Sequence, residues 1–372
     1  MSQRERMRSM RLAYKPHRGR SRVHGVLKII LIVVIVLVVL TIAALLHLRQ
    51  YMVYTADGNA RLQLPFEGQK AEEPSPASLS QPPMITLSPT PSTLNQRWEK
   101  ATAAQLYGLK ELNSQTIEEI ARRQDDQVVI EMKTGDGALF YASEQALAPE
   151  RTDAEVELAS VLWRLHSEGR SAAALLSCFQ DNWLSKQDKS LALTTSKKAL
   201  WQDGENNRWL NPYLTENQEY LIGIAEELAK MGFDEIILED CCFPETGKTE
   251  RISYGMEESP YTAVIDRFLT QMDEAMAEYN VWLSVITDEK TVLDGENAEN
   301  GQTRTSLLAH ADRIYVALEQ DSETTREDLE QAILKAREET ESKTDAPMEF
   351  YLVSIIKERT ETDAGSFLER PE

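Results

Sequence analysis

Acidic side chains stand at the ends of several apolar runs of this chain, where they can act as a pair. Glu239 and Asp240 follow the run Ile236–Leu238, and Asp288 follows the run 281–287. General acid and base catalysis commonly uses two carboxyl groups, of which one is protonated and the other is ionised. The side chains that we consider for these roles are Glu111, Glu131, Glu239, Asp240, Asp288 and Glu319.

The stretch Trp201–Pro244 contains the elements that would position the first pair. A Trp-Leu-Asn-Pro-Tyr loop at 209–213 opens an amphipathic helix predicted over Thr215–Gly232, in which Gly232 supplies the left-handed cap. A strand predicted over Glu235–Phe243 follows and contains the two acids. In α/β barrels, active sites are built from loops and from carboxylates at the ends of strands, and this stretch contains both.

The chain from about residue 105 onward repeats this alternation. Apolar strands alternate with helical patterns, which indicates a parallel sheet covered on both faces. We expect an α/β fold, a TIM-type (β/α)8-like barrel for which seven strands are found, and a doubly wound open sheet is the alternative. The predicted strands are Gln105–Lys110, Gln127–Lys133, Ala172–Phe179, Glu235–Phe243, Val281–Thr287, Arg313–Glu319 and Glu349–Ile356. The predicted helices are Thr116–Gln124, Ala154–Gly169, Thr215–Gly232, Tyr261–Tyr279, Thr303–Ala311 and Asp328–Glu339.

The N-terminal region predicts a membrane anchor. Residues 1–28 form a basic tail, and residues 29–46 are almost entirely Ile, Leu, Val and Ala. At about 1.5 Å per residue, this run is long enough to cross the hydrocarbon core of a bilayer. We expect a single transmembrane helix over 29–48 with a cytoplasmic N-terminus, because basic flanks stay inside. A cleaved signal peptide is the alternative, although no small-x-small cleavage motif follows the apolar run.

Two further segments separate the expected span from the expected barrel. Residues 49–66 predict a short hairpin that turns at Asp57-Gly58. Residues 67–98 are rich in Pro, Ser and Thr and cannot bury enough apolar surface to order themselves, so they predict a stiff linker. The barrel is expected over 99–372, outside the cell membrane.

Charge and composition exclude several classes of function. The chain has a net charge of −21 despite its basic tail, so its body repels phosphates and we expect no nucleic-acid partner. A Gly-rich phosphate loop and a Gly-x-Ser-x-Gly motif are both absent from the sequence, which argues against nucleotide binding and a serine hydrolase. The five histidines are scattered, so we expect no metal and no cofactor.

The three cysteines are Cys178 and the vicinal pair Cys241 and Cys242. Neighbouring residues on a strand point to opposite faces, so at most one of the vicinal pair can reach Cys178. A disulfide from Cys178 to either of them is one interpretation, and burial of all three as small hydrophobes is the other.

Several motifs occur in a fixed order: Val128–Lys133 with the turn Gly135-Asp-Gly137, Leu191–Thr195 with Trp201, the Trp-Leu-Asn-Pro-Tyr loop, and Gly232–Ile236 running to Phe243-Pro244. Together they resemble a family of bacterial glycoside-hydrolase-like barrels that is catalogued as a domain of unknown function. The resemblance extends from about residue 105 to the C-terminus and implies a barrel that acts on carbohydrate.

The sequence departs from the family pattern at three strand ends. Cys242 stands where the family has an arginine after the fourth strand. The fifth strand reads Leu283–Thr287 and its first acid is Asp288, whereas the family has an aspartate after this strand. The sixth strand ends in Val316–Gln320 instead of a Met-Tyr-Pro segment.

Glycoside hydrolysis needs two carboxylates that face one sugar bond. Glu239 is our preferred catalytic residue, with Glu319 or Asp288 as its partner. Alternation along the strand places Glu239 and Cys241 on one face and Asp240 and Cys242 on the other. If Glu239 points into the barrel, Asp240 is therefore expected to face the helices or a loop.

Other side chains are predicted to bind the substrate. Lys133 could pair with Glu131 or Glu239, the rings of Trp201 and Trp209 could stack on sugars, and Asn211 could bind a hydroxyl. The predicted substrate-binding residues are Glu131, Lys133, Asp181, Trp201, Trp209, Asn211 and Asp240. For each of them an ordinary role in packing, in a turn or as a solvated charge is the alternative.

The sequence thus predicts a membrane-anchored, extracytoplasmic glycoside-hydrolase-like protein at a bacterial cell envelope, with an envelope glycan as its partner. Hydrolysis of that glycan is the first hypothesis. A barrel without catalytic activity that binds glycan or acts as an envelope scaffold is the second, because a fold does not carry a function when site residues change.

Overall fold

The computed structural model describes residues 52–54, 60–62, 102–108, 118, 120, 122, 126–149, 158–255, 259–317, 324–357 and 365–370. The chain divides into two compact units, Met1–Ile85 and Thr86–Glu372. In the first unit, β1 (Met52–Tyr54) pairs antiparallel with β2 (Ala60–Leu62). The predicted turn at Asp57-Gly58 lies between them, outside the described residues.

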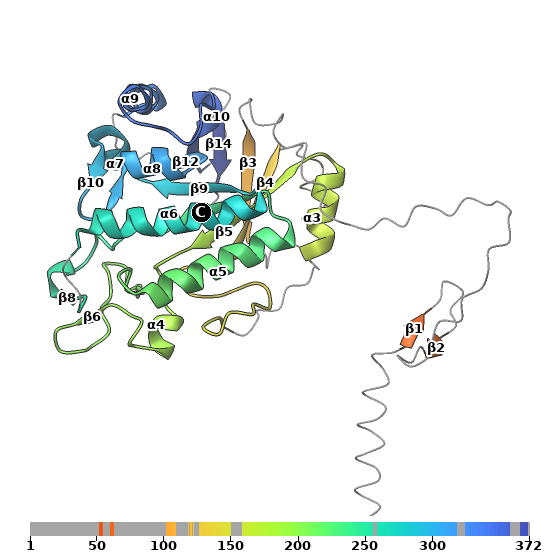
Figure 1. Ribbon diagram of the computed structural model, residues 1–372, viewed down its shortest axis with the longest axis horizontal. Coiled ribbons are helices and arrows are strands. Elements are labelled where there is room, and N and C mark those ends of the chain that lie inside the picture. The colour runs from red at the N-terminus through yellow and green to blue at the C-terminus, as the bar shows by residue number, and fades with distance from the viewer. Residues whose placement is uncertain are drawn as a thin grey trace, which may run out of the picture. The chain divides into compact units, whose positions relative to one another are not determined.

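The second unit is a closed barrel of eight parallel strands, in the order β12-β13-β14-β3-β4-β5-β7-β9 (Figure 1). Its closure confirms the (β/α)8-like fold and excludes the open sheet. The strands are β3 (Ala103–Gly108), β4 (Gln127–Lys133), β5 (Ser171–Ser177), β7 (Glu235–Glu239), β9 (Trp282–Thr287), β12 (Arg313–Ala317), β13 (Leu352–Ile356) and β14 (Ser366–Glu369).

The eighth strand is β14, which the sequence analysis did not find. Its four residues include only two large apolar side chains, Phe367 and Leu368, so it lacks the apolar run that marks the other strands. β14 pairs with β13 on one side and with β3 on the other, and so joins the end of the sheet to its beginning. Closure therefore depends on pairing with neighbours that are far away in the sequence.

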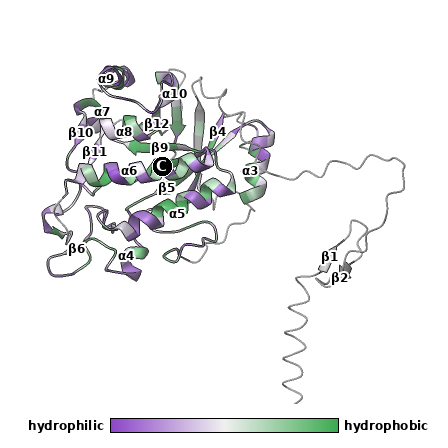
Figure 2. Ribbon diagram, viewed as in Figure 1, coloured by the Kyte–Doolittle hydropathy of each residue, from purple (hydrophilic) through white to green (hydrophobic). Residues whose placement is uncertain are grey.

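Helices lie on the outside of the barrel, where α5 and α6 run side by side (Figure 1). Both are amphipathic, with polar and apolar residues alternating along them, whereas β9 is mainly apolar (Figure 2). Gly232 ends α5 at φ 103°, the left-handed cap that the sequence predicted. The helices with described bounds are α3 (Leu158–Ser167), α4 (Leu184–Gln187), α5 (Thr215–Met231), α6 (Tyr261–Tyr279), α7 (Glu289–Asp294), α8 (Arg304–His310), α9 (Arg326–Glu339) and α10 (Met348–Tyr351).

Two predicted strands were too long. The strand predicted over Glu235–Phe243 ends at Glu239, because Asp240 leaves the extended conformation with φ 51°. The strand predicted over Glu349–Ile356 begins only at Leu352, since α10 occupies the preceding turn. Two small antiparallel pairs lie in the loops that follow the strands. In one, β6 (Thr194–Thr195) pairs with β8 (Ile252–Ser253), and the other is a hairpin of β10 (Glu296–Asn297) with β11 (Gln302–Thr303).

The barrel interior has three layers. The middle layer is apolar, and its buried members are Ala104, Val129, Ala173, Leu175, Ile237, Tyr315, Val353 and Leu368. Below it, at the amino ends of the strands, Arg313 and Glu235 form a fully buried ion pair. Above it, at the carboxyl ends, the same alternation directs side chains into the mouth. A packed middle and a polar mouth are what a barrel needs to hold a site at its carboxyl end.

The predicted basic tail (1–28), transmembrane helix (29–48) and linker (67–98) lie outside the described residues. Within the residues that are described, no helix is both long and apolar enough to span a bilayer.

Candidate active site at the mouth of the barrel

The alternation of side chains identifies the residues of the mouth. Ile237 belongs to the apolar middle layer, so Glu239, two residues later on β7, points into the mouth above it. The same step takes Val129 to Glu131 on β4. It also relates Leu175 on β5 to Ser177, and Leu368 on β14 to Arg370. On β12 this step takes Tyr315 to Ala317, and on β3 it takes Ala104 to Leu106, which packs on the apolar layer together with Ile286 and Ile355. Gly108, two residues beyond Leu106, pairs with Glu131.

Asp240 also reaches the mouth, contrary to the sequence prediction. Its carboxylate accepts a hydrogen bond of 2.6 Å from the hydroxyl of Ser177, the mouth residue of β5. Asp240 adopts φ 51°, in the left-handed region that Asp tolerates better than most residues. This conformation breaks the alternation of the strand, so Glu239 and Asp240 lie on the same side although they are adjacent in sequence.

Arg370 binds the second carboxylate of this pair. Its guanidinium donates to both oxygens of Glu239, with Nη2 at 3.3 Å from Oε2. The backbone N–H of Arg370 donates to the carbonyl of Ile356, which fixes the residue beside β13. Two-point contact between a guanidinium and a carboxylate restricts both groups. The pair is only part-buried, with side-chain exposures of 37% for Arg370 and 19% for Glu239.

The environment separates the two carboxyl groups electrostatically. Burial, followed by the nearby charge of Glu239, raises the pKa of Asp240 to about 6. The Ser177 hydroxyl and the charges of Lys133 and Arg370 oppose this rise without cancelling it. Burial opposes the charged form of Arg370, but Glu239, Glu131 and Asp240 together raise its pKa. Near pH 6 the mouth therefore holds a carboxyl group that can carry a proton, Asp240, beside Glu239, to which Arg370 donates at both oxygens.

Lys133 has a different partner from the one predicted. Its ammonium lies 3.0 Å from Oδ2 of Asp181, both side chains are fully buried, and it also donates to the carbonyl of Ser177. The prediction was wrong because the strand is irregular between Glu131 and Lys133, and this register shift turns Lys133 away from the mouth. Lys133 and Asp181 thus anchor the carboxyl ends of β4 and β5 beneath the site.

Gly137 makes room for this anchor. It adopts φ 83°, and a Cβ atom at this position would lie 2.2 Å from Oδ1 of Asp181. That same oxygen accepts from the backbone N–H of Leu184. A glycine is therefore required here by both backbone conformation and space.

Asp288 lies in a second polar group that follows β7 and β9. One of its oxygens caps α7 by accepting from the N–H of Thr291 at 2.6 Å. The other accepts from the amides of Asn297 at 3.1 Å and Asn300 at 2.8 Å. The Asn297 amide also donates to Glu245, whose pKa is raised mainly by burial. Asp288 is thus held by three donors and organises the loops beside the mouth.

The predicted sugar-stacking residues have structural contacts instead. Trp201 and Trp209 are 3% and 6% exposed, so neither offers a ring face to a ligand. Their indole N–H groups donate to the Lys248 carbonyl and to Asp203. Asn211 is buried and ties the loop together, because its amide donates to the carbonyl of Tyr254. Residue types alone did not distinguish these packing roles from binding roles.

Two candidates, Glu111 and Glu319, lie outside the described residues. The sequence analysis missed Arg370 and Ser177. Arg370 had no signal, because the strand before it was not recognised. Ser177 could have been found, since it ends a strongly predicted strand.

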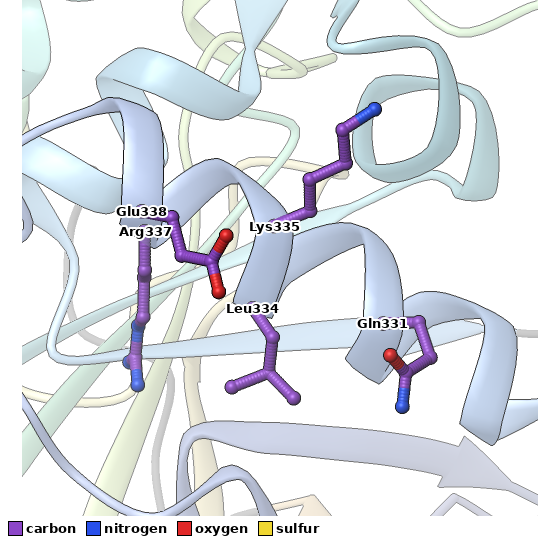
Figure 3. A pocket seen from close by; sticks show the side chains of 5 residues that line it. All are labelled: Gln331, Leu334, Lys335, Arg337 and Glu338. Carbon is purple, nitrogen blue, oxygen red and sulfur yellow. The ribbon is translucent and has the colours of Figure 1, made fainter.

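A hollow on the protein surface lies away from these groups, on helix α9. It is lined by Gln331, Leu334, Lys335, Arg337 and Glu338 (Figure 3). All five side chains come from one helix, and Lys335 points away from Leu334. Such a surface lacks the converging polar groups of a catalytic site. Across the described ranges, no group of three or more His, Cys, Asp or Glu side chains is arranged to hold a metal ion.

The chain is similar to several known proteins. A family model described as "Putative glycosyl hydrolase domain" matches residues 102–317. The glycoside hydrolase domain of PgaB (BpsB) from Bordetella bronchiseptica is 14% identical with a TM-score of 0.50, over 69% of this chain and 84% of that one. A hypothetical protein from Ruminiclostridium thermocellum is 26% identical with a TM-score of 0.43, over 49% and 96%. No curated protein matches the chain significantly.

Proposed function

The chain belongs to the family of this glycosyl hydrolase domain, and we propose that its barrel cleaves a glycosidic bond with Asp240 as proton donor and Glu239 as the ionised partner. The observation that supports this most strongly is the electrostatic separation of two adjacent carboxyl groups in the mouth. A pair whose environments differ in this way is the usual sign of an acid and base assignment.

The proposed reaction assigns each side chain a step. Asp240 transfers its proton to the oxygen of the leaving sugar as the glycosidic bond breaks. The sugar that remains develops positive charge at its anomeric carbon, and the carboxylate of Glu239 stabilises that charge. A water molecule then forms a bond to this carbon and gives its proton to the Asp240 carboxylate, which restores the acid. Ser177 orients Asp240 through its 2.6 Å hydrogen bond, and Arg370 orients Glu239.

The substrate class follows from the family together with the N-terminal sequence. A basic tail and an apolar run precede a linker rich in Pro, Ser and Thr, which supports an anchored barrel held away from a membrane. We therefore propose a glycan of the bacterial cell envelope as the substrate, with the barrel on the outer side of the membrane.

A second function is favoured by the ion pair itself. Both oxygens of Glu239 already accept hydrogen bonds from Arg370. To act in catalysis, Glu239 would have to give up part of this contact and face the substrate instead. A barrel that kept this pair closed would bind glycan without cleaving it. Binding in the absence of cleavage is therefore the alternative that the experiment must separate from hydrolysis.

The test uses the full chain, purified in detergent, with preparations of envelope glycans. We expect release of reducing ends, and a loss of about 10²- to 10⁴-fold in Asp240→Asn, because general acid catalysis contributes this much. Asp188→Asn is the matched control, since Asp188 is a fully exposed acid outside the mouth. Equal release by wild type and Asp240→Asn would remove Asp240 from the mechanism. Sedimentation with the glycan without any release would establish the binding function instead.

A further inference from the structure

Two of the three cysteines meet directly beneath the proposed acid. Cys178 is the first residue after β5, and Cys241 follows Asp240. Both side chains are fully buried, and both belong to the apolar core outside the barrel wall. All three cysteines are free thiols in the structure.

The backbone holds these two residues side by side. Ser177 pairs with Glu239 as the last rung between β5 and β7. Beyond it, the N–H of Cys178 donates to the Glu239 carbonyl at 2.8 Å, and the N–H of Phe179 to the Asp240 carbonyl at 3.2 Å. The two segments therefore stay hydrogen-bonded to each other just beyond the ends of β5 and β7. Disulfides require this closeness of backbones before any side chain is considered.

The left-handed conformation of Asp240 selects which cysteine faces Cys178. With regular alternation Cys241 would share the face of Glu239 in the mouth. Because φ at Asp240 is 51°, Cys241 turns outward instead, and its thiol lies beside that of Cys178. Cys178 is the largest influence on the pKa of Cys241, whereas for Cys242 it comes after burial and the charges of Asp240 and Glu245. Of the two disulfides that the sequence left open, the structure therefore favours Cys178 with Cys241.

We propose that Cys178 and Cys241 form a disulfide that fixes Asp240 in its left-handed conformation. The oxidant is a small-molecule disulfide. The thiolate of one cysteine attacks it and releases one thiol, and the thiolate of the second cysteine then attacks the mixed disulfide and releases the other. The protein loses two protons and two electrons, and the oxidant is reduced to two thiols.

The bond forms while the chain folds. In the folded protein the neighbouring thiol of Cys178 and burial raise the pKa of the Cys241 thiol well above its ordinary value. A buried, protonated thiol is a poor nucleophile, so the native protein exchanges slowly in either direction. Once made, the bond closes a loop of about 60 residues that includes α4 and α5, and a loop of this length gives substantial stabilisation.

The experiment refolds the denatured full chain in detergent, in buffers of graded reduced and oxidised glutathione. The refolded protein is quenched with acid, denatured and alkylated, and its intact mass counts the free thiols. We expect three alkylated thiols in reducing buffer and one in oxidising buffer, with a linked peptide pair that joins Cys178 to Cys241. Alkylation of all three thiols at every ratio would overturn the proposal, and so would a link that involves Cys242.

Two variants keep the result interpretable. Cys242→Ser should still form the bond, whereas Cys178→Ala should keep two free thiols in every buffer. The melting temperature of the oxidised wild type should exceed that of the reduced form by several degrees, on the order of 10 °C at most, and should not depend on redox buffer in Cys178→Ala. A gain in hydrolysis on oxidation rests on the proposed function, but the mass measurement stands without it.

Discussion

Strand β7 begins and ends with a glutamate that pairs with an arginine, and the two ion pairs differ in their burial and in their surroundings. At the floor of the barrel Glu235 and Arg313 are both fully buried. At the mouth Glu239 and Arg370 remain part-exposed. The floor pair is surrounded by further donors and acceptors, and the groups that bind Glu235 or Arg313 are Thr102, Gln127, Ser284, Tyr315 and the Phe350 carbonyl.

This difference separates a structural ion pair from one that can take part in chemistry. Both oxygens of Glu235 accept hydrogen bonds, so the buried charge of this carboxylate is fully compensated by its neighbours. At the mouth one guanidinium faces Glu239, Asp240 and Glu131, so the negative charges outnumber it. Burial, followed by the charge of Glu239, raises the pKa of Asp240, and such shifts cluster at functional sites.

The largest predicted effect tests the floor. Arg313→Met leaves Glu235 buried without its cation, and breaking a buried pair in this way costs about 3–5 kcal/mol. Urea denaturation at pH 7 measures the free energy of unfolding. Arg370→Met is the matched variant and should cost about 1 kcal/mol or less, because part-exposed pairs contribute little. Equal losses in the two variants would abolish the distinction between floor and mouth.

The sequence predicted the strands and helices of the barrel better than its mouth. Strand β4 and helix α6 have the predicted bounds, because long apolar patterns of strand or helix period determine them locally. Strand β14 was missed since its stability comes from pairing with β3 and β13, which no local pattern encodes. Arg370 was missed together with its strand.

The errors within the site have one physical origin. Asp240 and Cys241 were assigned to the wrong faces because strict alternation was assumed through a residue that adopts a left-handed conformation. Lys133 was given the wrong partner because a register shift precedes it. Periodicity arguments hold only as long as the backbone stays regular, and functional sites are where it departs from regularity.

The second prediction concerns the stability cost of the mouth. The pKa of Asp240 is raised from 3.8 to about 6, so the folded state holds a proton that the unfolded state releases between these values. The contribution of this proton to the stability of the folded state is therefore fully present below pH 3.8, and it is lost as pH rises through about 6. Asp240→Asn removes the charge, so it should be more stable than wild type by about 1–3 kcal/mol at pH 7.

The advantage of this variant should vanish near pH 4, where Asp240 of the wild type is protonated. Asn tolerates the left-handed conformation as Asp does, so the comparison is free of backbone strain. Urea denaturation at both pH values is the measurement. A variant less stable than wild type at pH 7 would mean that Asp240 contributes to folding as the floor residues do.

The smallest predicted effect separates the role of Arg370 from that of the floor arginine. The proposed mechanism requires the protonated form of Asp240, so kcat/KM should fall as pH rises through about 6. The charge of Arg370 lowers the pKa of Asp240. Arg370→Met removes this charge and also leaves that of Glu239 unneutralised, and both changes raise the pKa of Asp240. The falling limb should therefore move to higher pH, by roughly one unit or less.

Arg370→Lys keeps a positive charge and should restore the limb even if the geometry of the pair is imperfect. Where Arg370→Met is too slow to assay, carbon NMR of the labelled Asp240 carboxyl follows the same titration directly. Movement of the limb to lower pH would mean that Arg370 acts on another group. An unmoved limb, together with lost stability, would make the mouth pair a structural contact of the same kind as Arg313 with Glu235.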